Sequence, residues 1–174
     1  MAETLETKRM LLRPAGPQDA SLLSHWRGVE DYLELVYSRG KQRCNLEFMI
    51  ERRKGGEPVG VVYAFSYNQS DGYVFLNVFV EEAYRRFGYG AEACILAICY
   101  LFDTLPLYKI YCDAISSNIQ SVSMMKGAGL TQEGLLRGHS VHNGVRHDVA
   151  RFAVHQENLA HLRMLLSRFQ GVRA

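Results

Sequence analysis

One segment of the chain combines residue types that together suit the binding of a diphosphate. Residues 78–91 read Val-Phe-Val-Glu-Glu-Ala-Tyr-Arg-Arg-Phe-Gly-Tyr-Gly-Ala, so a strand-like run ends, two arginines follow and a helix begins at small residues. The first N–H groups of a helix have no partner within it and carry partial positive charge. Gly88 and Gly90 lack a Cβ, so a phosphate can approach closely, and Arg85 and Arg86 add full charges. These features predict a pyrophosphate site.

The same segment also fits readings that involve no ligand. A plain strand-to-helix connection with exposed arginines has the same spacing, because short glycine motifs are weak signals. The G-x-G-x-x-G pattern of dinucleotide-binding folds is absent, and no Gly-Lys-Ser/Thr follows as in a P-loop. Nucleic acid is not an expected partner, since the net charge is only +2 and no Lys/Arg-rich run is present.

The cysteines and the apolar runs set the expected environment. Cys44, Cys94, Cys99 and Cys112 include no Cys-x-x-Cys pair, which predicts reduced core thiols and no metal site. The N-terminus has no basic region followed by an apolar one, and no apolar run is long enough to cross a membrane. We therefore expect a cytoplasmic protein without a membrane partner.

Hydrophobic patterns predict the elements that must position the diphosphate segment. Strands are predicted at Lys8–Arg13, Val59–Tyr67, Tyr73–Val80, Tyr108–Asp113, Leu135–His142 and Val145–Val154. Helices are predicted at Gln18–Trp26, Leu46–Arg53, Gly88–Phe102, Ser117–Lys126 and Glu157–Phe169. Asn143-Gly144 predicts a tight hairpin between the last two strands. The order fits a single α/β domain over residues 1–174, with one mixed sheet and helices on its faces.

Two blocks of sequence resemble the GNAT superfamily of N-acetyltransferases. Residues 85–90, Arg-Arg-Phe-Gly-Tyr-Gly, are similar to its Gln/Arg-x-x-Gly-x-Gly/Ala signature. Asn118, Ser121 and Gly129-Leu130 resemble its Asn-x-x-Ala/Ser helix that ends in Gly-Phe. The order of elements is most similar to the Rim-type and spermidine-acetyltransferase branch. The resemblance implies a mostly antiparallel twisted sheet flanked by helices, and acetyl-CoA as the cosubstrate without a metal.

The resemblance also implies roles within the coenzyme site. Backbone groups of Phe79 and Val80 would bind the pantetheine arm as an added strand does. Backbone N–H groups from Arg86 to Ala91 would hold the diphosphate, with Arg85 nearby. Asn118 would bind the pantetheine, although Asn is also a favoured helix N-cap. The expected cofactor-binding residues are Phe79, Val80, Arg85, Arg86, Phe87, Gly88, Tyr89, Gly90, Ala91 and Asn118.

In this family the amine usually attacks the thioester directly, so the resemblance implies a ternary complex without an acyl-enzyme. Holding the amine near the carbonyl can lower the barrier by roughly 7–11 kcal/mol, and the N–H of Val80 is the candidate that stabilises the oxyanion. Many members carry a Tyr acid seven residues after the Asn, but Met125 stands there. The leaving thiolate would then be protonated by a water or another side chain, or would leave without help from an acid.

Three residues are candidates for handling the acceptor amine: Asn77, Glu34 and His139. Asn77, inside the Tyr73–Val80 strand, could orient a water or the acceptor, or be a hydrogen-bonded core residue. His139 and His142 lie on the strand that flanks the acceptor site in the family and titrate near neutral pH. A surface position in the hairpin would explain both histidines as well.

An acidic patch of Glu30, Asp31 and Glu34 bears on the choice of acceptor. The resemblance implies that this segment lines the acceptor pocket, where carboxylates would attract a polyamine, an aminoglycoside or an amino sugar. A solvated helix face would look the same. Three functions stay open: acetylation of a small amine, acetylation of a protein N-terminus, and non-catalytic sensing of CoA. A homodimer is also possible, because family members often dimerise.

Overall fold

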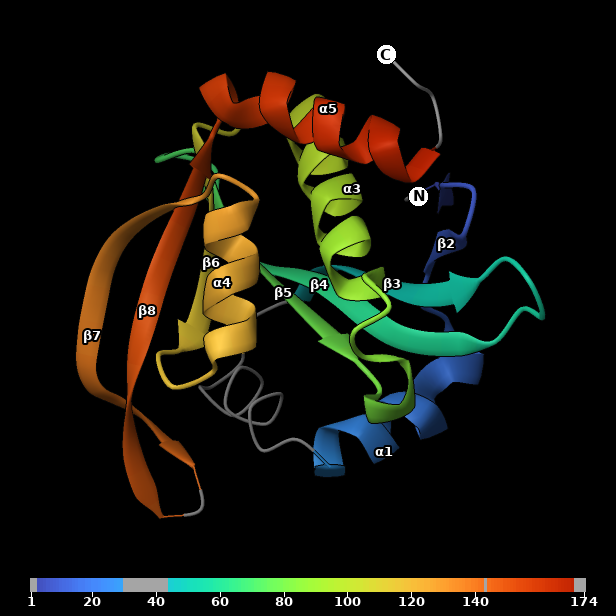
Figure 1. Ribbon diagram of the computed structural model, residues 1–174, viewed down its shortest axis with the longest axis horizontal. Helices are drawn as coiled ribbons and strands as arrows, with labels where there is room; N and C mark the ends of the chain where they lie inside the picture. Colours follow the sequence, from blue (N-terminus) through green and yellow to red (C-terminus); the bar gives the residue numbers. More distant parts are fainter. Residues whose placement is uncertain (1–2, 30–43, 143, 171–174) are drawn as a thin grey trace.

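The computed structural model describes residues 3–29, 44–142 and 144–170 of the chain. These residues form one eight-stranded sheet in the order β1-β2-β3-β4-β5-β6-β8-β7 (Figure 1). The strands are β1 (Leu5–Glu6), β2 (Met10–Pro14), β3 (Cys44–Arg52), β4 (Pro58–Asn68), β5 (Tyr73–Val80), β6 (Lys109–Ile115), β7 (Thr131–His142) and β8 (Val145–His155). Every neighbouring pair is antiparallel except β5 and β6, which run parallel. The expected mixed, mostly antiparallel sheet is confirmed.

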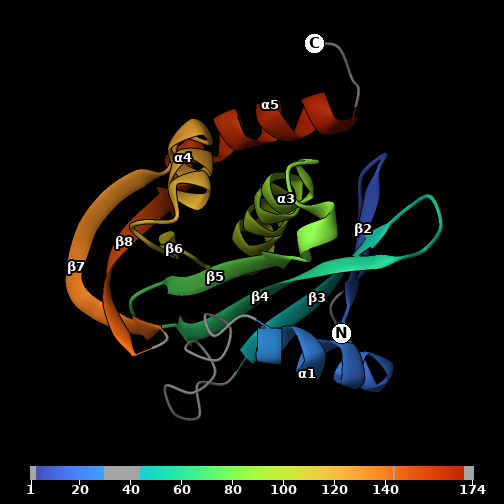
Figure 2. The same ribbon diagram turned by 60° about the horizontal axis from the view of Figure 1, so that its bottom comes forward.

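Helices cover both faces of this sheet, as Figure 2 shows. One face carries α3 (Tyr89–Thr104), α4 (Ile119–Gly127) and α5 (Leu159–Gln170), and the other carries α1 (Ala20–Val29). Three short 3-10 turns lie before helices. Pro17–Asp19 leads into α1, Glu82–Tyr84 lies in the segment before α3, and Gln156–Asn158 leads into α5. Among the described residues, every helix is too short or too polar to cross a lipid bilayer.

Each face of the sheet buries its own apolar cluster. The larger cluster surrounds α3, whose Ile98 and Leu101 are almost completely buried. The smaller cluster lies under α1, where the ring of Trp26 packs 5.4 Å from the ring of Phe79, measured between centroids. Phe79 therefore directs its side chain toward α1, while the neighbouring Val80 packs against the α3 cluster. The end of β5 thus contributes to both layers.

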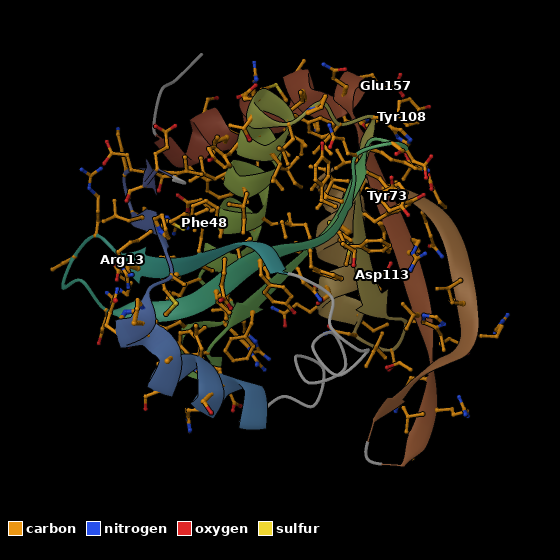
Figure 3. The ribbon with its side chains drawn as sticks, turned by 180° about the vertical axis from the view of Figure 1, so that it is seen from behind. Arg13, Phe48, Tyr73, Tyr108, Asp113 and Glu157 are labelled. Carbon is orange, nitrogen blue, oxygen red and sulfur yellow. The ribbon has the colours of Figure 1, made fainter. Side chains whose placement is uncertain are left out.

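The segment Leu46–Arg53 was predicted to be a helix, and that prediction was wrong. It forms most of β3, which pairs with β2 on one edge and with β4 on the other. Phe48 (labelled in Figure 3) and Ile50 are buried on the α3 side, whereas Met49 is buried on the α1 side. A strand buried on both faces shows no apolar–polar alternation. Leu, Glu and Met also favour helices, so local propensity and pattern both concealed the strand.

The other predicted elements are confirmed, with ends shifted by a few residues. The turn between β4 and β5 closes with Gly72 N–H donating to the Asn68 carbonyl at 2.9 Å, and Gly72 has a φ of 68°. The last hairpin closes with His142 opposite Val145. Asn143, whose type predicted that turn, lies outside the described residues.

An ion pair fixes the start of α1 against the sheet. The Arg13 guanidinium donates to both carboxylate oxygens of Asp19 at 2.9 Å and to Glu51 of β3 at 2.8 Å (Figure 3). The Arg13 hydrogen bonds hold the pKa of Asp19 below its ordinary value. The layer that covers Phe79 and the neighbouring strand positions is therefore anchored at its first turn.

Candidate active site

β5 and β6 separate midway along their length, which opens the sheet. They pair at three positions, the last of which is Phe75 opposite Tyr111. β5 nevertheless continues to Val80, and β6 continues to Ile115. Beyond Phe75 the facing edges of these two strands have no strand partner within the described part of the chain. An extended ligand could therefore take up strand hydrogen bonds in the gap between them.

Alternate backbone groups of β5 point into this gap. On the opposite edge of β5, Glu81 N–H donates to the Val59 carbonyl of β4 at 2.9 Å. Hydrogen-bonding direction alternates along an antiparallel strand. Val80 and Val78 therefore direct their N–H and C=O groups toward the gap, whereas Phe79 directs its own toward β4. Of the two expected pantetheine partners, Val80 faces the gap through its backbone and Phe79 faces β4.

The start of α3 touches the end of β5. A Cβ built on Gly90 would lie 3.3 Å from a methyl carbon of Val80, so the glycine permits this close approach. Gly88 is the N-cap and has a φ of 83°, a left-handed conformation. The first hydrogen bond within the helix runs from Glu92 N–H to Gly88 C=O at 3.1 Å. The N–H groups of residues 89–91 therefore have no partner within the helix, as an anion site requires.

The two arginines before α3 take different positions. Arg85 folds back on the strand, where its Nε donates to the Val80 carbonyl at 2.8 Å and its guanidinium carbon lies 5.8 Å from the centre of the Phe79 ring. Arg86 is exposed and has a φ of 69°. Residues other than glycine rarely adopt this conformation, and such strain concentrates at functional sites. Arg86 is thus the more exposed cation beside the start of α3.

A row of polar side chains crosses the sheet where the gap begins. Glu47 of β3 stands opposite Tyr63 of β4, and Tyr63 stands opposite Asn77 of β5. Asp113 of β6 lies two residues past the last β5–β6 pair, as Asn77 does on β5. Side chains two residues apart share a face of a strand. Asn77 and Asp113 therefore lie on opposite edges of the gap, on the face that α1 covers.

Arg151 of β8 holds the Asp113 carboxylate in place. Arg151 Nε donates to Oδ1 of Asp113 at 2.9 Å, and Nη2 donates to Oδ2 at 2.7 Å. The hydrogen bonds that Arg151 donates to Asp113 raise the pKa of Arg151. The Asp113 side chain keeps 20% of its surface exposed and Arg151 keeps 29%. The ion pair is therefore partly exposed to solvent.

Aromatic rings cover the same face of the sheet next to Asp113. Phe75 stacks on Tyr111 with 5.1 Å between ring centroids, and Phe65 stacks on Phe75 with 5.5 Å. Tyr73 meets the edge of Tyr111 at 5.6 Å. Figure 3 labels Tyr73 and Asp113 near the paired part of β5 and β6. The gap thus opens beside a partly exposed aromatic surface.

An apolar cavity of about 310 Å³ lies between α3, α4 and α5. Its lining begins at Ala91, in the first turn of α3, and includes Met125 of α4 and Arg168 of α5. Met125 is 5% exposed and occupies the position where many GNAT members carry Tyr. Its thioether has no proton to give, so this wall of the cavity supplies no acid at that position.

Asn118 caps α4. Its Oδ1 accepts a hydrogen bond from Ser121 N–H at 3.1 Å, and its side chain is exposed. The amide nitrogen can still donate to a ligand. The N-cap reading is therefore confirmed, and the contact with pantetheine stays a prediction.

Two of the three predicted catalytic residues are not brought together by the described structure. Glu34, with the rest of the acidic patch at Glu30 and Asp31, lies outside the described residues. His139 is exposed on β7, which β8 separates from β6. Of the two that the structure describes, Asn77 stands at the gap.

Sequence reasoning missed the partner that Asn77 faces. Asp113 is a polar residue inside a strand and stands five residues before Asn118, which could have singled it out. A polar residue on a half-exposed strand is common, however. Only the register of β5, β6 and β8 shows that Asp113 lies opposite Asn77 and is held by Arg151.

Known acetyltransferases are similar to the chain along most of its length. The family model for the acetyltransferase (GNAT) domain matches residues 9–131. "Uncharacterized N-acetyltransferase YoaA" of Bacillus subtilis is 22% identical over 88% of this chain and 97% of its own. Spermidine N(1)-acetyltransferase of Escherichia coli K12 is 24% identical over 79% of this chain and 76% of its own.

Solved structures share the fold. The spermidine/spermine N-acetyltransferase SpeG of Vibrio cholerae aligns with a TM-score of 0.75 at 20% identity, over 87% of this chain and 96% of its own. A GCN5-related N-acetyltransferase of Brucella melitensis aligns with a TM-score of 0.77 at 19% identity, over 97% of this chain and 85% of its own. Another structure of the Vibrio cholerae enzyme is dodecameric. With a family match that spans most of its residues, the chain belongs to the GNAT family of acetyltransferases.

Proposed function

We propose that the chain transfers the acetyl group of acetyl-CoA to a primary amine of a small cationic molecule, by direct attack in a ternary complex. One observation carries this proposal. The gap between β5 and β6 has the unpaired N–H groups of α3 at one end, and Asn77 and Asp113 at the other. A diphosphate suits the first end and a reacting thioester suits the second, with strand hydrogen bonds between them.

The coenzyme would then lie along the open edge of β5. The N–H groups of residues 89–91 and the guanidinium of Arg86 bind the diphosphate. The pantetheine arm receives a hydrogen bond from the N–H group of Val80, so the oxyanion role expected for Val80 passes to the Val78 N–H, deeper in the gap. The strand from Val80 to Leu76 spans roughly 13 Å, so an extended arm brings the thioester to the two polar side chains.

The acceptor amine arrives as an ammonium ion and must lose a proton before it attacks. Asp113 takes that proton, directly or through a water, and Asn77 orients the nitrogen. The nitrogen then bonds to the thioester carbonyl carbon, and the oxyanion accepts a hydrogen bond from the Val78 N–H. Collapse breaks the C–S bond. The second proton of the nitrogen reaches the leaving thiolate through solvent, because Met125 cannot donate one.

One feature supports a small cationic acceptor: among the relatives are enzymes named for spermidine. The rings of Phe75 and Tyr111 already carry the Arg151 guanidinium, at 4.9 and 5.3 Å from their centres. A protein N-terminus is the alternative acceptor. The CoA sensor has less support, because Asp113 supplies on β6 the carboxylate that β5 lacks. We also propose that the chain self-associates, since SpeG does; light scattering measures this directly.

The test of this function is release of the CoA thiol from acetyl-CoA in the presence of separate amines. The panel holds spermidine, spermine, an aminoglycoside, an amino sugar and a peptide with a free N-terminus, and mass spectrometry identifies the acetylated product. We expect turnover with at least one small amine. Turnover with the peptide alone would support the N-terminal alternative. Tight CoA binding without turnover on any amine would support the sensor.

Gly60 allows β4 to approach the end of β5 closely. A single methyl group added there should therefore lower both the stability of the fold and the affinity for acetyl-CoA. A Cβ on Gly60 would lie 2.2 Å from the Phe79 carbonyl oxygen and 3.1 Å from the Val80 Cα. Gly60→Ala must therefore displace the strand that holds the pantetheine. We expect a loss of about 1–3 kcal/mol in unfolding free energy, and roughly tenfold weaker binding of acetyl-CoA. Denaturant unfolding and calorimetry measure the two effects.

Gly134→Ala is the matched control for this substitution. Gly134 lies on β7, and a Cβ built there meets nothing within 4 Å. We expect Gly134→Ala to change neither the unfolding free energy nor the affinity for acetyl-CoA. Unaltered acetyl-CoA affinity in a destabilised Gly60→Ala variant would show that the end of β5 does not contact the coenzyme.

A further inference from the structure

Arg9 reaches from the edge of the sheet into the turn before α3. It lies between β1 and β2, where its backbone N–H donates to the Thr7 hydroxyl at 3.2 Å. Its Nη1 donates to the Phe87 carbonyl at 3.1 Å. Its Nε and Nη2 both donate to Oε2 of Glu92, at 2.9 and 2.5 Å. One guanidinium therefore spans the whole first turn of α3, from the residue before its N-cap to its fourth residue.

The contact with Phe87 fixes the direction of a peptide group in the proposed diphosphate site. In a trans peptide the C=O and N–H groups point in opposite directions. Because the Phe87 carbonyl points at Arg9, the N–H of Gly88 points away from Arg9. Without Arg9 this carbonyl could turn toward the phosphates, where its partial negative charge would repel them.

The contact with Glu92 neutralises a charge beside the same site. The Glu92 side chain is fully buried in the first turn of α3, and its Oε1 has no hydrogen-bond partner among the residues that the structure describes. Both hydrogen bonds from Arg9 go to Oε2. An uncompensated buried carboxylate is costly, and here it would also repel a diphosphate. The Arg9 guanidinium is held between the rings of Tyr89 and Phe169, at 5.1 and 5.8 Å from their centres.

We infer that Arg9 is a positioning residue for the coenzyme diphosphate: it orients the Phe87–Gly88 peptide and neutralises Glu92 without touching the acetyl group or the acceptor. The inference rests on the proposed binding of acetyl-CoA. It assigns a role to a residue outside the glycine-containing turn. It also explains why the turn keeps its shape although Arg86 and Gly88 both have positive φ.

The experiment compares acetyl-CoA with S-acetylpantetheine, which has the same thioester arm but no diphosphate. Affinities for both compounds are measured by NMR titration, which reads weak binding, for the wild type, Arg9→Gln and Arg9→Lys. We expect Arg9→Gln to weaken acetyl-CoA binding about 30-fold, as the loss of hydrogen bonds to charged groups implies. Binding of acetylpantetheine should change less than about threefold. Arg9→Lys keeps the positive charge but loses the planar set of N–H donors of the guanidinium. Its affinity for acetyl-CoA should therefore lie between those of the wild type and Arg9→Gln.

Arg53→Gln is the matched control, because Arg53 serves the same corner of the sheet without reaching α3. Its Nη1 donates to the Thr7 carbonyl at 2.9 Å, and it pairs with Glu6 at 3.4 Å. We expect this variant to bind both compounds as the wild type does, and circular dichroism checks that every variant is folded. Equal losses for both compounds in Arg9→Gln, or wild-type affinity in Arg9→Lys, would overturn the positioning role. A wild type that binds both compounds equally would overturn the diphosphate site itself.

Discussion

We expect the Gly88→Glu variant to lose acetyl-CoA binding while it remains folded. Gly88 has a φ of 83°, and a Cβ there meets nothing closer than Arg9 Nη2 at 3.5 Å. The side chain therefore fits, at a strain of about 1–2 kcal/mol for the left-handed conformation. Its carboxylate places a negative charge where the diphosphate must lie, and it competes with the Phe87 carbonyl for Arg9.

The magnitude of this effect follows from like-charge repulsion. Two such charges about 5 Å apart near a protein surface repel by roughly 3 kcal/mol, which corresponds to at least about 100-fold in affinity. Calorimetry with acetyl-CoA measures the loss. Gly88→Ala separates charge from backbone strain, because it adds the strain alone, and it should bind within about tenfold of the wild type.

Gly55→Glu is the second control, since Gly55 has a φ of 100° and open space around it but lies in the turn between β3 and β4. It should lose stability as Gly88→Glu does and keep its affinity for acetyl-CoA. If Gly88→Glu bound acetyl-CoA normally, the start of α3 would not be the diphosphate site, and the proposed course of the coenzyme along β5 would be wrong.

Local sequence was sufficient to predict that a helix begins after the two arginines, at small residues; the anion site there stays a prediction. The small residues, the adjacent arginines and the strand that precedes them all act within one continuous segment, residues 78–91. The structure adds the left-handed N-cap at Gly88 and the separate positions of Arg85 and Arg86. Hairpins with strong turn signals, such as the one that ends at Gly72, were predictable for the same reason.

Features that depend on pairing between distant segments could not be predicted. β3 is a strand because β2 and β4 cover its two edges and helices cover its two faces, none of which its own residues reveal. Arg9 is 78 residues from the Phe87 carbonyl that it binds. The placement of Asn77 and Asp113 on the two edges of the gap depends on where β5 and β6 part, after Phe75 and Tyr111.

Asp113→Asn is the second substitution from which we expect a large effect. The amide has nearly the shape of the carboxylate, and its oxygen can still accept one of the two hydrogen bonds from Arg151, although its NH2 group cannot accept the other. It cannot take a proton from the acceptor ammonium, however. A general base contributes about 10²–10⁴-fold, so kcat should fall by roughly that factor near neutral pH, while the affinity for acetyl-CoA measured by calorimetry stays close to that of the wild type.

Raising the pH distinguishes proton removal from a structural role for Asp113. An alkyl ammonium has a pKa of about 10.4, so the fraction of free amine rises as the pH approaches that value. The free amine needs no base before it attacks, and the deficit of Asp113→Asn should shrink accordingly. Asp148→Asn, which removes the carboxylate that pairs with Arg137 in the distal part of the β7–β8 hairpin, should keep the wild-type kcat at every pH. A deficit of Asp113→Asn that stayed constant with pH would mean that Asp113 only anchors Arg151 and the aromatic surface, and the base would then have to come from another residue that lines the gap.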